Sequence, residues 1–150
     1  MSSLRKVKKE RKKKEEKARQ FSAALDTLKT LRYETSGYSG IEETVFTVRG
    51  DMVLRSYIPS FLKSQESRCF DEPFGKRAAF CEGLRALNIH EWKRRYSDDL
   101  ILDGMRWELE LVFGGRYQLV RIRGYNAYPE QFDALLELLG LEENDEQDQD

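Results

Sequence analysis

The residues that most often build metal and nucleophilic sites are scarce in this chain, which has 150 residues but only two cysteines and one histidine. Cys69, Cys81 and His90 cannot complete a four-ligand zinc site without carboxylates. Two cysteines in a chain of this size predict free thiols rather than a disulfide, and free thiols are typical of the cytoplasm. We therefore expect a cytoplasmic protein.

Long apolar runs are missing as well. No segment approaches the roughly 20 apolar residues of a membrane helix. The basic N-terminus is not followed by an apolar segment, so it is not typical of a secretory signal. We expect no membrane partner.

Signatures of catalysis are also absent from the sequence. It has no glycine-rich phosphate-binding loop, and His90 has no serine or cysteine partner at a telling spacing. The alternative left open is a metal-dependent nuclease, because clustered carboxylates can hold Mg²⁺ for phosphodiester cleavage. Its candidate ligands are Asp98, Asp99, Asp103, Glu108 and Glu110. No downstream lysine completes a familiar nuclease pattern, so we predict a non-catalytic protein with no cofactor, no bound metal and no small-molecule substrate.

What the sequence has in excess is charge, gathered at its two ends. Residues 1–20 hold ten Lys or Arg and three Glu, a net charge of +7. Residues 141–150 hold six acids and no base, a net charge of −6. We predict a basic helical extension over residues 1–20, a single α+β domain over 21–140 and a disordered acidic tail over 141–150.

The hydrophobic pattern predicts an α+β fold. Apolar residues continue at helical spacing from Phe21 to Leu31, whereas β-branched and aromatic runs further on are typical of strands. The expected elements are, in chain order, a helix 4–32, strands 41–48 and 52–58, an irregular stretch 60–75, a helix 76–87, strands 105–113 and 116–123, and a helix beginning near Pro129. The architecture expected from this order, α-β-β-α-β-β-α, is an antiparallel sheet of two hairpins with helices packed on one face.

The second predicted hairpin supplies a candidate binding surface within the domain. Gly114 and Gly115 suit a two-residue turn, which would fix the register of the two strands. The predicted facing pairs are Leu111–Gln118, Leu109–Val120 and Trp107–Ile122 on the buried face, and Glu110–Leu119, Glu108–Arg121 and Arg106–Arg123 on the outer face. A like-charge pair destabilises a sheet, and it persists more easily when an anion bridges it. The candidate residues of this outer face are Arg106, Arg121 and Arg123, with Tyr117 beside them; the alternative is that these arginines are simply solvated.

A second mixture of cations and aromatics lies just upstream. Lys93, Arg94 and Arg95 stand between Trp92 and Tyr96, a combination that single-stranded nucleic acid uses. The alternative is that Trp92 and Tyr96, four residues apart, form the buried side of a short helix whose basic residues face solvent.

The basic extension is the strongest candidate for contact with another molecule. Ten cations attract phosphates and steer association, so nucleic acid or a nucleoprotein is the expected partner. The alternatives are that the helix binds a protein with an acidic groove, or that it only makes the chain soluble. They stay open because Glu10, Glu15 and Glu16 can pair with lysines on a solvated helix. The residues expected to bind are Lys8, Lys9, Arg11, Lys12, Lys13 and Lys14. The acidic tail either keeps the chain in solution or competes for the same partner.

The segment after the second hairpin has the composition of a tight corner. Gly124 allows close packing of the backbone, and Asn126 can hydrogen-bond the turn. Pro129 suits the first turn of a helix. Tyr125 and Tyr128 either pin this corner to the core or stand exposed for binding.

This corner also carries a resemblance. The residues concerned are Ile101-Leu102-Asp103-Gly104, Trp107-Glu108-Leu109-Glu110-Leu111, Gly124-Tyr125-Asn126-Ala127-Tyr128-Pro129 and Phe132. Together, over about residues 100–140, they resemble the C-terminal part of small uncharacterised proteins of Gram-positive bacteria and their plasmids and phages. Proteins of this kind lie among mobile-element genes, a neighbourhood that includes anti-CRISPR inhibitors of Cas9.

The resemblance implies an interaction protein of a bacterium or its mobile elements. We expect it to dock on a nucleic-acid machine, with an inhibitor of an RNA-guided nuclease as one form, and direct RNA or DNA binding as the alternative. We also expect a monomer, because the five apolar residues between Phe21 and Leu31 make a poor seam for pairing two helices.

Overall fold

The computed structural model describes residues 2–37, 40–59, 71–98, 100 and 104–141 of the chain. Its helices and strands are, in chain order, α1 (Ser2–Leu25), β1 (Leu28–Gly37), β2 (Gly40–Arg49), β3 (Met52–Pro59), β4 (Glu72–Lys76), α2 (Arg77–Ala86), the 3₁₀ turn η2 (Ile89–Glu91), β5 (Arg95–Ser97), β6 (Arg106–Phe113), β7 (Val120–Tyr125) and α3 (Phe132–Leu138). The predicted α+β class is therefore confirmed, with a helix at the N-terminus.

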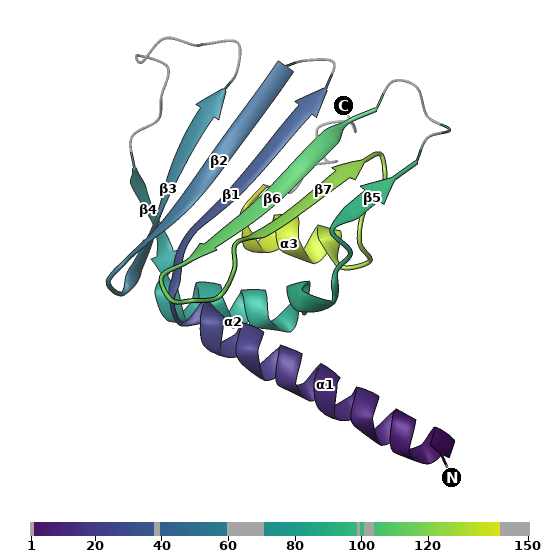
Figure 1. Cartoon of the computed structure of the whole chain (residues 1–150). Helices are drawn as coiled ribbons and strands as arrows, with labels where there is room; N and C mark the ends of the chain where they lie inside the picture. The colour runs from purple at the N-terminus through teal and green to yellow at the C-terminus, as the bar shows by residue number, and fades with distance from the viewer. Residues whose placement is uncertain (1, 38–39, 60–70, 99, 101–103, 142–150) are drawn as a thin grey trace.

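The strands form one seven-stranded sheet in the order β4-β3-β2-β1-β6-β7-β5. All neighbours are antiparallel except β5 and β7, which are parallel. Figure 1 shows α2 and α3 on one side of the sheet, while the other side faces the viewer and α1 projects from the lower edge. The prediction of only two hairpins is wrong, because three further strands extend and join them.

The central strand β1 is the largest correction. The predicted helix 4–32 ends at Leu25, where the backbone N–H and the hydroxyl of Thr27 both donate to the carbonyl of Ala24. From there Leu31 and Tyr33 face the core, and Arg32 between them faces outward. Residues 28–31 fit both the helical and the strand period, since Leu28 and Leu31, three residues apart, continue the helical stripe. Pairing on both edges, with β2 and with β6, decides in favour of the strand.

The hairpin of β6 and β7 has the predicted faces but not the predicted register. Trp107, Leu109, Leu111, Val120 and Ile122 are all buried, as expected, but Gln118, which was predicted on the same face, is exposed and lies outside the strands. However, the observed outer pairs are Arg106–Tyr125, Glu108–Arg123 and Glu110–Arg121, a shift of two residues. Because side chains alternate with a period of two, such a shift keeps each face intact and changes only the partners. The predicted like-charge pair Arg106–Arg123 is therefore wrong.

A longer connection causes this shift. Residues 114–119 lie outside the strands, so the two glycines are not the whole turn. The ring of Tyr117 packs against Phe113 and Phe21, with centroid distances of 5.1 and 5.9 Å. Tyr117 therefore fixes a larger loop over the end of α1 rather than standing beside the outer arginines.

The remaining elements follow the sequence more closely. The hairpin of β2 and β3 is confirmed, with Gly50 at a positive φ of 57° in its turn. The helix predicted over 76–87 is α2. The edge strands β4 and β5 were not predicted, and residues 60–70 of the stretch predicted as irregular lie outside the described part of the chain.

The last two turns of α1 belong to the core. Phe21, Ala24 and Leu25 are buried, whereas residues 3–17 are exposed. Arg85 of α2 clamps this end: its guanidinium donates to the Ser22 hydroxyl at 2.9 Å and pairs with Asp26 at 2.5 Å. The exposed part of α1 is thus held at one end by a packed and hydrogen-bonded anchor.

The predicted corner residues all have structural roles. Asn126 adopts a positive φ of 54°, and its Oδ1 accepts a hydrogen bond from the Met105 backbone N–H at 2.9 Å. The indole N–H of Trp107 donates to the carbonyl of Ala127 at 3.0 Å. Pro129 is buried one turn before α3 rather than inside it, and its carbonyl accepts from the N–H of Phe132. The corner therefore closes the start of β6 against the end of β7.

Gly124 lies directly opposite Trp107, and a Cβ built there would be 1.9 Å from the indole nitrogen. Gly124→Ala is expected to lower the free energy of unfolding by about 2–3 kcal/mol, because the buried indole cannot move without losing its hydrogen bond. Gly75→Ala is the matched control, since no atom lies within 4 Å of its Cβ. Chemical denaturation of both variants checks this, and equal midpoints would contradict it.

Candidate nucleic-acid interface

The basic extension is an exposed and nearly unpaired helical arm. All ten Lys and Arg side chains of residues 1–20 are exposed. Among the residues that the structure describes, one of them forms an ion pair, Arg19 with Glu16 at 3.0 Å, which leaves nine. Lys8, Lys9, Arg11, Lys12, Lys13 and Lys14, the residues predicted to bind, all belong to this set. The glutamates therefore do not neutralise the arm.

A second group of charges lies on the outer face of the sheet, around Arg32 of β1. Its guanidinium contacts the carboxylates of Glu108 at 2.5 Å, Glu34 at 3.0 Å and Glu110 at 3.5 Å. Arg121 pairs with Glu110 at 2.7 Å, and Arg123 pairs with Glu108 at 2.8 Å. Three arginines thus balance three glutamates in this network, which we call the Arg32 network. Arg121 and Arg123 are held by carboxylates rather than left open for a ligand.

The Arg32 network changes the acidity of its members. Burial alone would raise the pKa of Glu108, but hydrogen bonds from Arg32 and Arg123 outweigh burial and hold that pKa below its ordinary value. Burial would likewise lower the pKa of Arg32, and Glu108 and Glu110 together raise it. Both shifts favour the charged forms. Arg32 was not among the predicted site residues, because it lies at the end of the predicted helix 4–32, which gave no sign of these strands.

Arg95 and Arg106, on the edge of this face, form no ion pair with another described residue. Both line a polar groove of about 750 Å³ at the β5 side of the outer face, together with Arg123 and Tyr125. The guanidinium of Arg106 lies 5.4 Å from the ring centre of Tyr125. Arg95 is the register partner of Arg123. A like-charge neighbour of Arg123 does exist, therefore, but on β5 and not on β6.

The groove is not purely basic, since Glu34 and Glu108 also line it. Glu108 is already held by Arg32 and Arg123. The open capacity of the groove for an anion therefore comes from Arg95 and Arg106. The ring of Tyr125 lines the same groove, so the groove can hold a phosphate near a flat ring.

The other predicted aromatics are packed rather than open. Trp92 is half-buried, and its indole N–H donates to the carbonyl of Leu87 at 3.1 Å. Tyr96 is half-buried on β5, and its ring centre lies 6.1 Å from that of Trp107. Lys93 and Arg94 are exposed between them. The expected buried side is correct, although these residues form a turn and a strand, not a helix.

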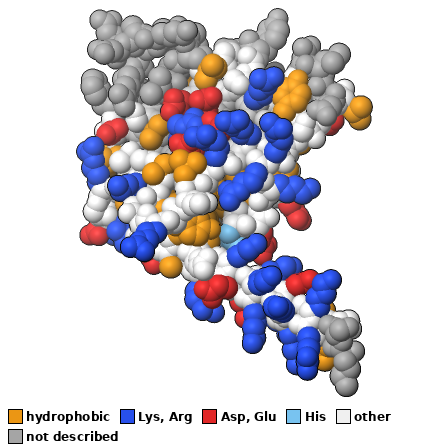
Figure 2. Space-filling view, viewed as in Figure 1, with side chains coloured by type: hydrophobic (Ala, Val, Ile, Leu, Met, Phe, Trp, Pro, Cys, Tyr) orange, Lys and Arg blue, Asp and Glu red, His pale blue; other side chains and the backbone are white. Residues whose placement is uncertain are grey.

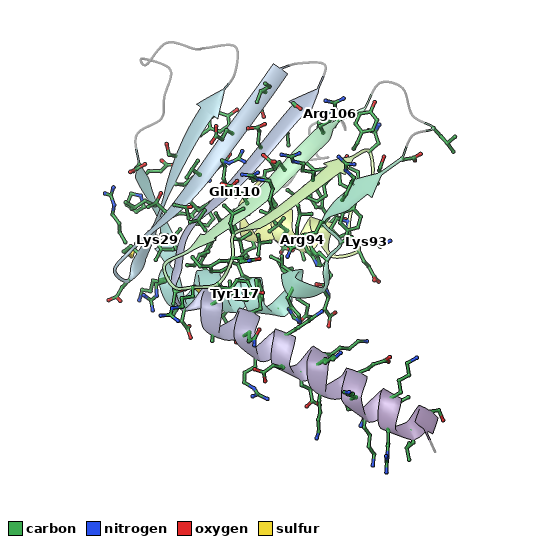
Figure 3. The ribbon with its side chains drawn as sticks, in the orientation of Figure 1. Lys29, Lys93, Arg94, Arg106, Glu110 and Tyr117 are labelled. Carbon is green, nitrogen blue, oxygen red and sulfur yellow. The ribbon has the colours of Figure 1, made fainter. Side chains whose placement is uncertain are left out.

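Figure 2 shows Lys and Arg side chains along α1 and over the strands of the outer face, with Asp and Glu side chains among them. In Figure 3, Arg106 stands at the upper end of β6, Lys93 and Arg94 lie on the β5 side, and Tyr117 lies at the lower end near α1. The structure thus separates Tyr117 from Arg106.

The catalytic alternatives gain no support from the geometry. Glu108 and Glu110 are occupied by arginines, and Asp99 and Asp103 lie outside the described residues. Cys81 is buried with its thiol against the carbonyl of Leu25, and burial raises its pKa. Within the described residues no group of three His, Cys, Asp or Glu side chains could hold a metal ion.

Two further findings concern membrane-spanning helices and similarity to known proteins. No helix in the described ranges is long and apolar enough to cross a membrane. Comparison of the chain with protein-family models, with curated proteins and with solved structures found no match.

Proposed function

We propose that this chain is a non-catalytic interaction protein that contacts nucleic acid, free or within a nucleoprotein, through the basic arm of α1. The observation that carries the proposal is the set of nine exposed cations on one anchored helix that form no ion pair with any described residue. Exposed cations along a helix attract the negative charges of a phosphate backbone.

The polar groove supports the same function. It contributes Arg95 and Arg106 beside the ring of Tyr125. This combination suits one nucleotide of a single strand, with its phosphate on the arginines and its base on the ring. The arm supplies the charge that speeds encounter, and the groove supplies a short-range contact that holds the complex.

The test is fluorescence anisotropy of labelled duplex DNA, duplex RNA and single-stranded RNA, titrated with the full chain from about 50 to 300 mM salt. We expect binding that weakens steeply with salt, because each neutralised phosphate of duplex DNA contributes about 0.9 to the slope of log K against log salt. Absence of binding to all three at the lowest salt would refute contact with free nucleic acid and leave only the nucleoprotein form of the proposal.

The finer proposal is that the nucleoprotein is an RNA-guided nuclease such as Cas9, which the chain inhibits by occlusion. It rests on the resemblance of residues 100–140. The full chain should then slow target cleavage by guide-loaded Cas9 in a dose-dependent manner. Unchanged cleavage at a large excess of the chain would refute inhibition of Cas9, but it would not contradict the proposed contact with nucleic acid.

A further inference from the structure

The side of the sheet that carries α2 and α3 is not covered along its whole length. A groove of about 520 Å³ lies between α3 and the far ends of the long strands β1, β2 and β3. Across its floor runs a row of register partners, Tyr33 of β1, Thr44 of β2 and Tyr57 of β3, with Thr35 and Glu42 as the next pair. We call it the inner groove. The groove stays open because α3, with seven residues, is too short to cover strands β1 and β2, which have ten residues each.

The lining of the inner groove has the chemistry of a site for cations. Four aromatic rings contribute to it, those of Tyr33, Tyr57, Tyr128 and Phe132. Its acidic members are Glu42, Glu130 and Asp133, all exposed, and no described residue that lines it is Lys or Arg. Aromatic faces and carboxylates together attract ammonium and guanidinium groups. The predicted acidic tail after Leu141 lies outside the described residues.

The tip of α1 has the complementary chemistry. Leu4 and Val7 are 59% and 52% exposed, and they are three residues apart, so they share one face of the helix. Lys8 and Arg11 lie four residues after them on the same face. The tip is therefore a small apolar patch inside a basic helix, and the inner groove has an apolar wall of Met105, Leu136 and Leu141 inside an acidic rim.

A chain cannot insert this tip into its own groove. α1 is one continuous helix from Ser2 to Leu25, packed at its far end through Phe21 and Leu25. At about 1.5 Å per residue, Leu4 stands roughly 25 Å from Phe21 along the helix axis. In Figure 1 the helix points away from α3.

We propose that the inner groove binds the tip of α1 from a second copy of this chain. The contact joins two different surfaces, so two copies can exchange arms in a closed dimer, or many copies can form an open series. It is small, so we expect association only at tens to hundreds of micromolar protein, weakened by salt. This inference is independent of the proposed function; nucleic acid on the arm would compete with it.

The experiment is sedimentation velocity of the nucleic-acid-free full chain across this concentration range, with two reversed variants. The rim variant carries Glu130→Lys and Asp133→Lys. The tip variant carries Lys6→Glu, Lys8→Glu, Lys9→Glu and Arg11→Glu, which leaves one base and five acids in residues 4–11. Every changed side chain is exposed, so both variants should fold. Each alone should remain monomeric, because its tip and groove then have charges of the same sign.

Mixing the two variants gives the decisive result. The acidic tip of one then meets the basic groove of the other, and the basic tip meets the acidic groove, so an equimolar mixture should associate as the natural chain does. Asp51→Lys with Glu91→Lys is the matched control; both side chains are exposed and neither lines the groove. A natural chain that stays monomeric throughout, association that survives the rim variant, or a mixture that does not associate would each overturn the proposal.

Discussion

Replacing Lys8, Lys9, Lys12 and Lys13 by Glu is expected to lower the affinity for duplex DNA or RNA by about a hundredfold or more at 100 mM salt. The change takes residues 1–20 from ten bases and three acids to six bases and seven acids, so their net charge falls from +7 to −1. The four side chains are exposed and outside the core, and the helix keeps residues of high helix propensity. Anisotropy over the same salt series should also give a slope shallower by up to about 3 to 4.

A matched control separates the position of the charge from the net charge of the chain. It reverses four exposed bases outside α1, namely Lys29, Arg49, Lys76 and Arg77. If the arm makes the contact, this control should lose less than about tenfold in affinity, since it changes only the long-range field. Equal losses in both variants would show that overall charge, not the arm, governs binding.

The features that were predictable from the sequence are those set by local pattern. Alternation placed the correct residues of β6 and β7 on the buried face, and Gly50 between two β-rich runs marked the hairpin of β2 and β3. The charge of the arm follows directly from the composition of residues 1–20. The corner followed from the conformational preferences of Gly124, Asn126 and Pro129, although the helix begins later than Pro129.

The features that were not predictable depend on distant pairing. Leu28 and Leu31 continue the helical stripe, and only the edges of β2 and β6 show that they belong to a strand. The register of β7 depends on Tyr117 packing against Phe21, which is 96 residues earlier (117 − 21). The Arg32 network includes Arg32, which was assigned to the end of a helix, and the inner groove includes Tyr33 and Thr35, which were assigned to no strand. Neither site could therefore be predicted.

The short edge strands were not predictable for a different reason. β5 has three residues, Arg95 to Ser97, and only Tyr96 faces the core. Such a segment has no alternation long enough to recognise. Its place beside β7 nevertheless decides the candidate site, because it sets Arg95 next to Arg123.

Arg32→Gln is expected to lower the free energy of unfolding by about 2–3 kcal/mol at pH 7. Arg32 is the one arginine that contacts all three glutamates of its network, and its side chain is only 20% exposed. Its loss leaves Glu34, Glu108 and Glu110 close together with less positive charge between them. Arg121→Gln is the matched control: that side chain is 47% exposed, so its ion pairs should contribute at most about 1 kcal/mol. Chemical denaturation measures both.

The pH dependence shows whether charge or packing causes the loss. The folded-state pKa of Glu108 lies below its ordinary value of 4.5, so its stabilising effect is present above that value and is lost as the pH falls through the folded pKa. The difference in stability between the natural chain and Arg32→Gln should therefore be constant from about pH 6 to 9, and should shrink as the pH falls below 4.5. A difference that stays constant down to pH 3 would mean that the alkyl chain of Arg32, and not its charge, stabilises the outer face. The network would then be a consequence of the fold, and Arg121 and Arg123 would be as free to bind an anion as Arg95 and Arg106.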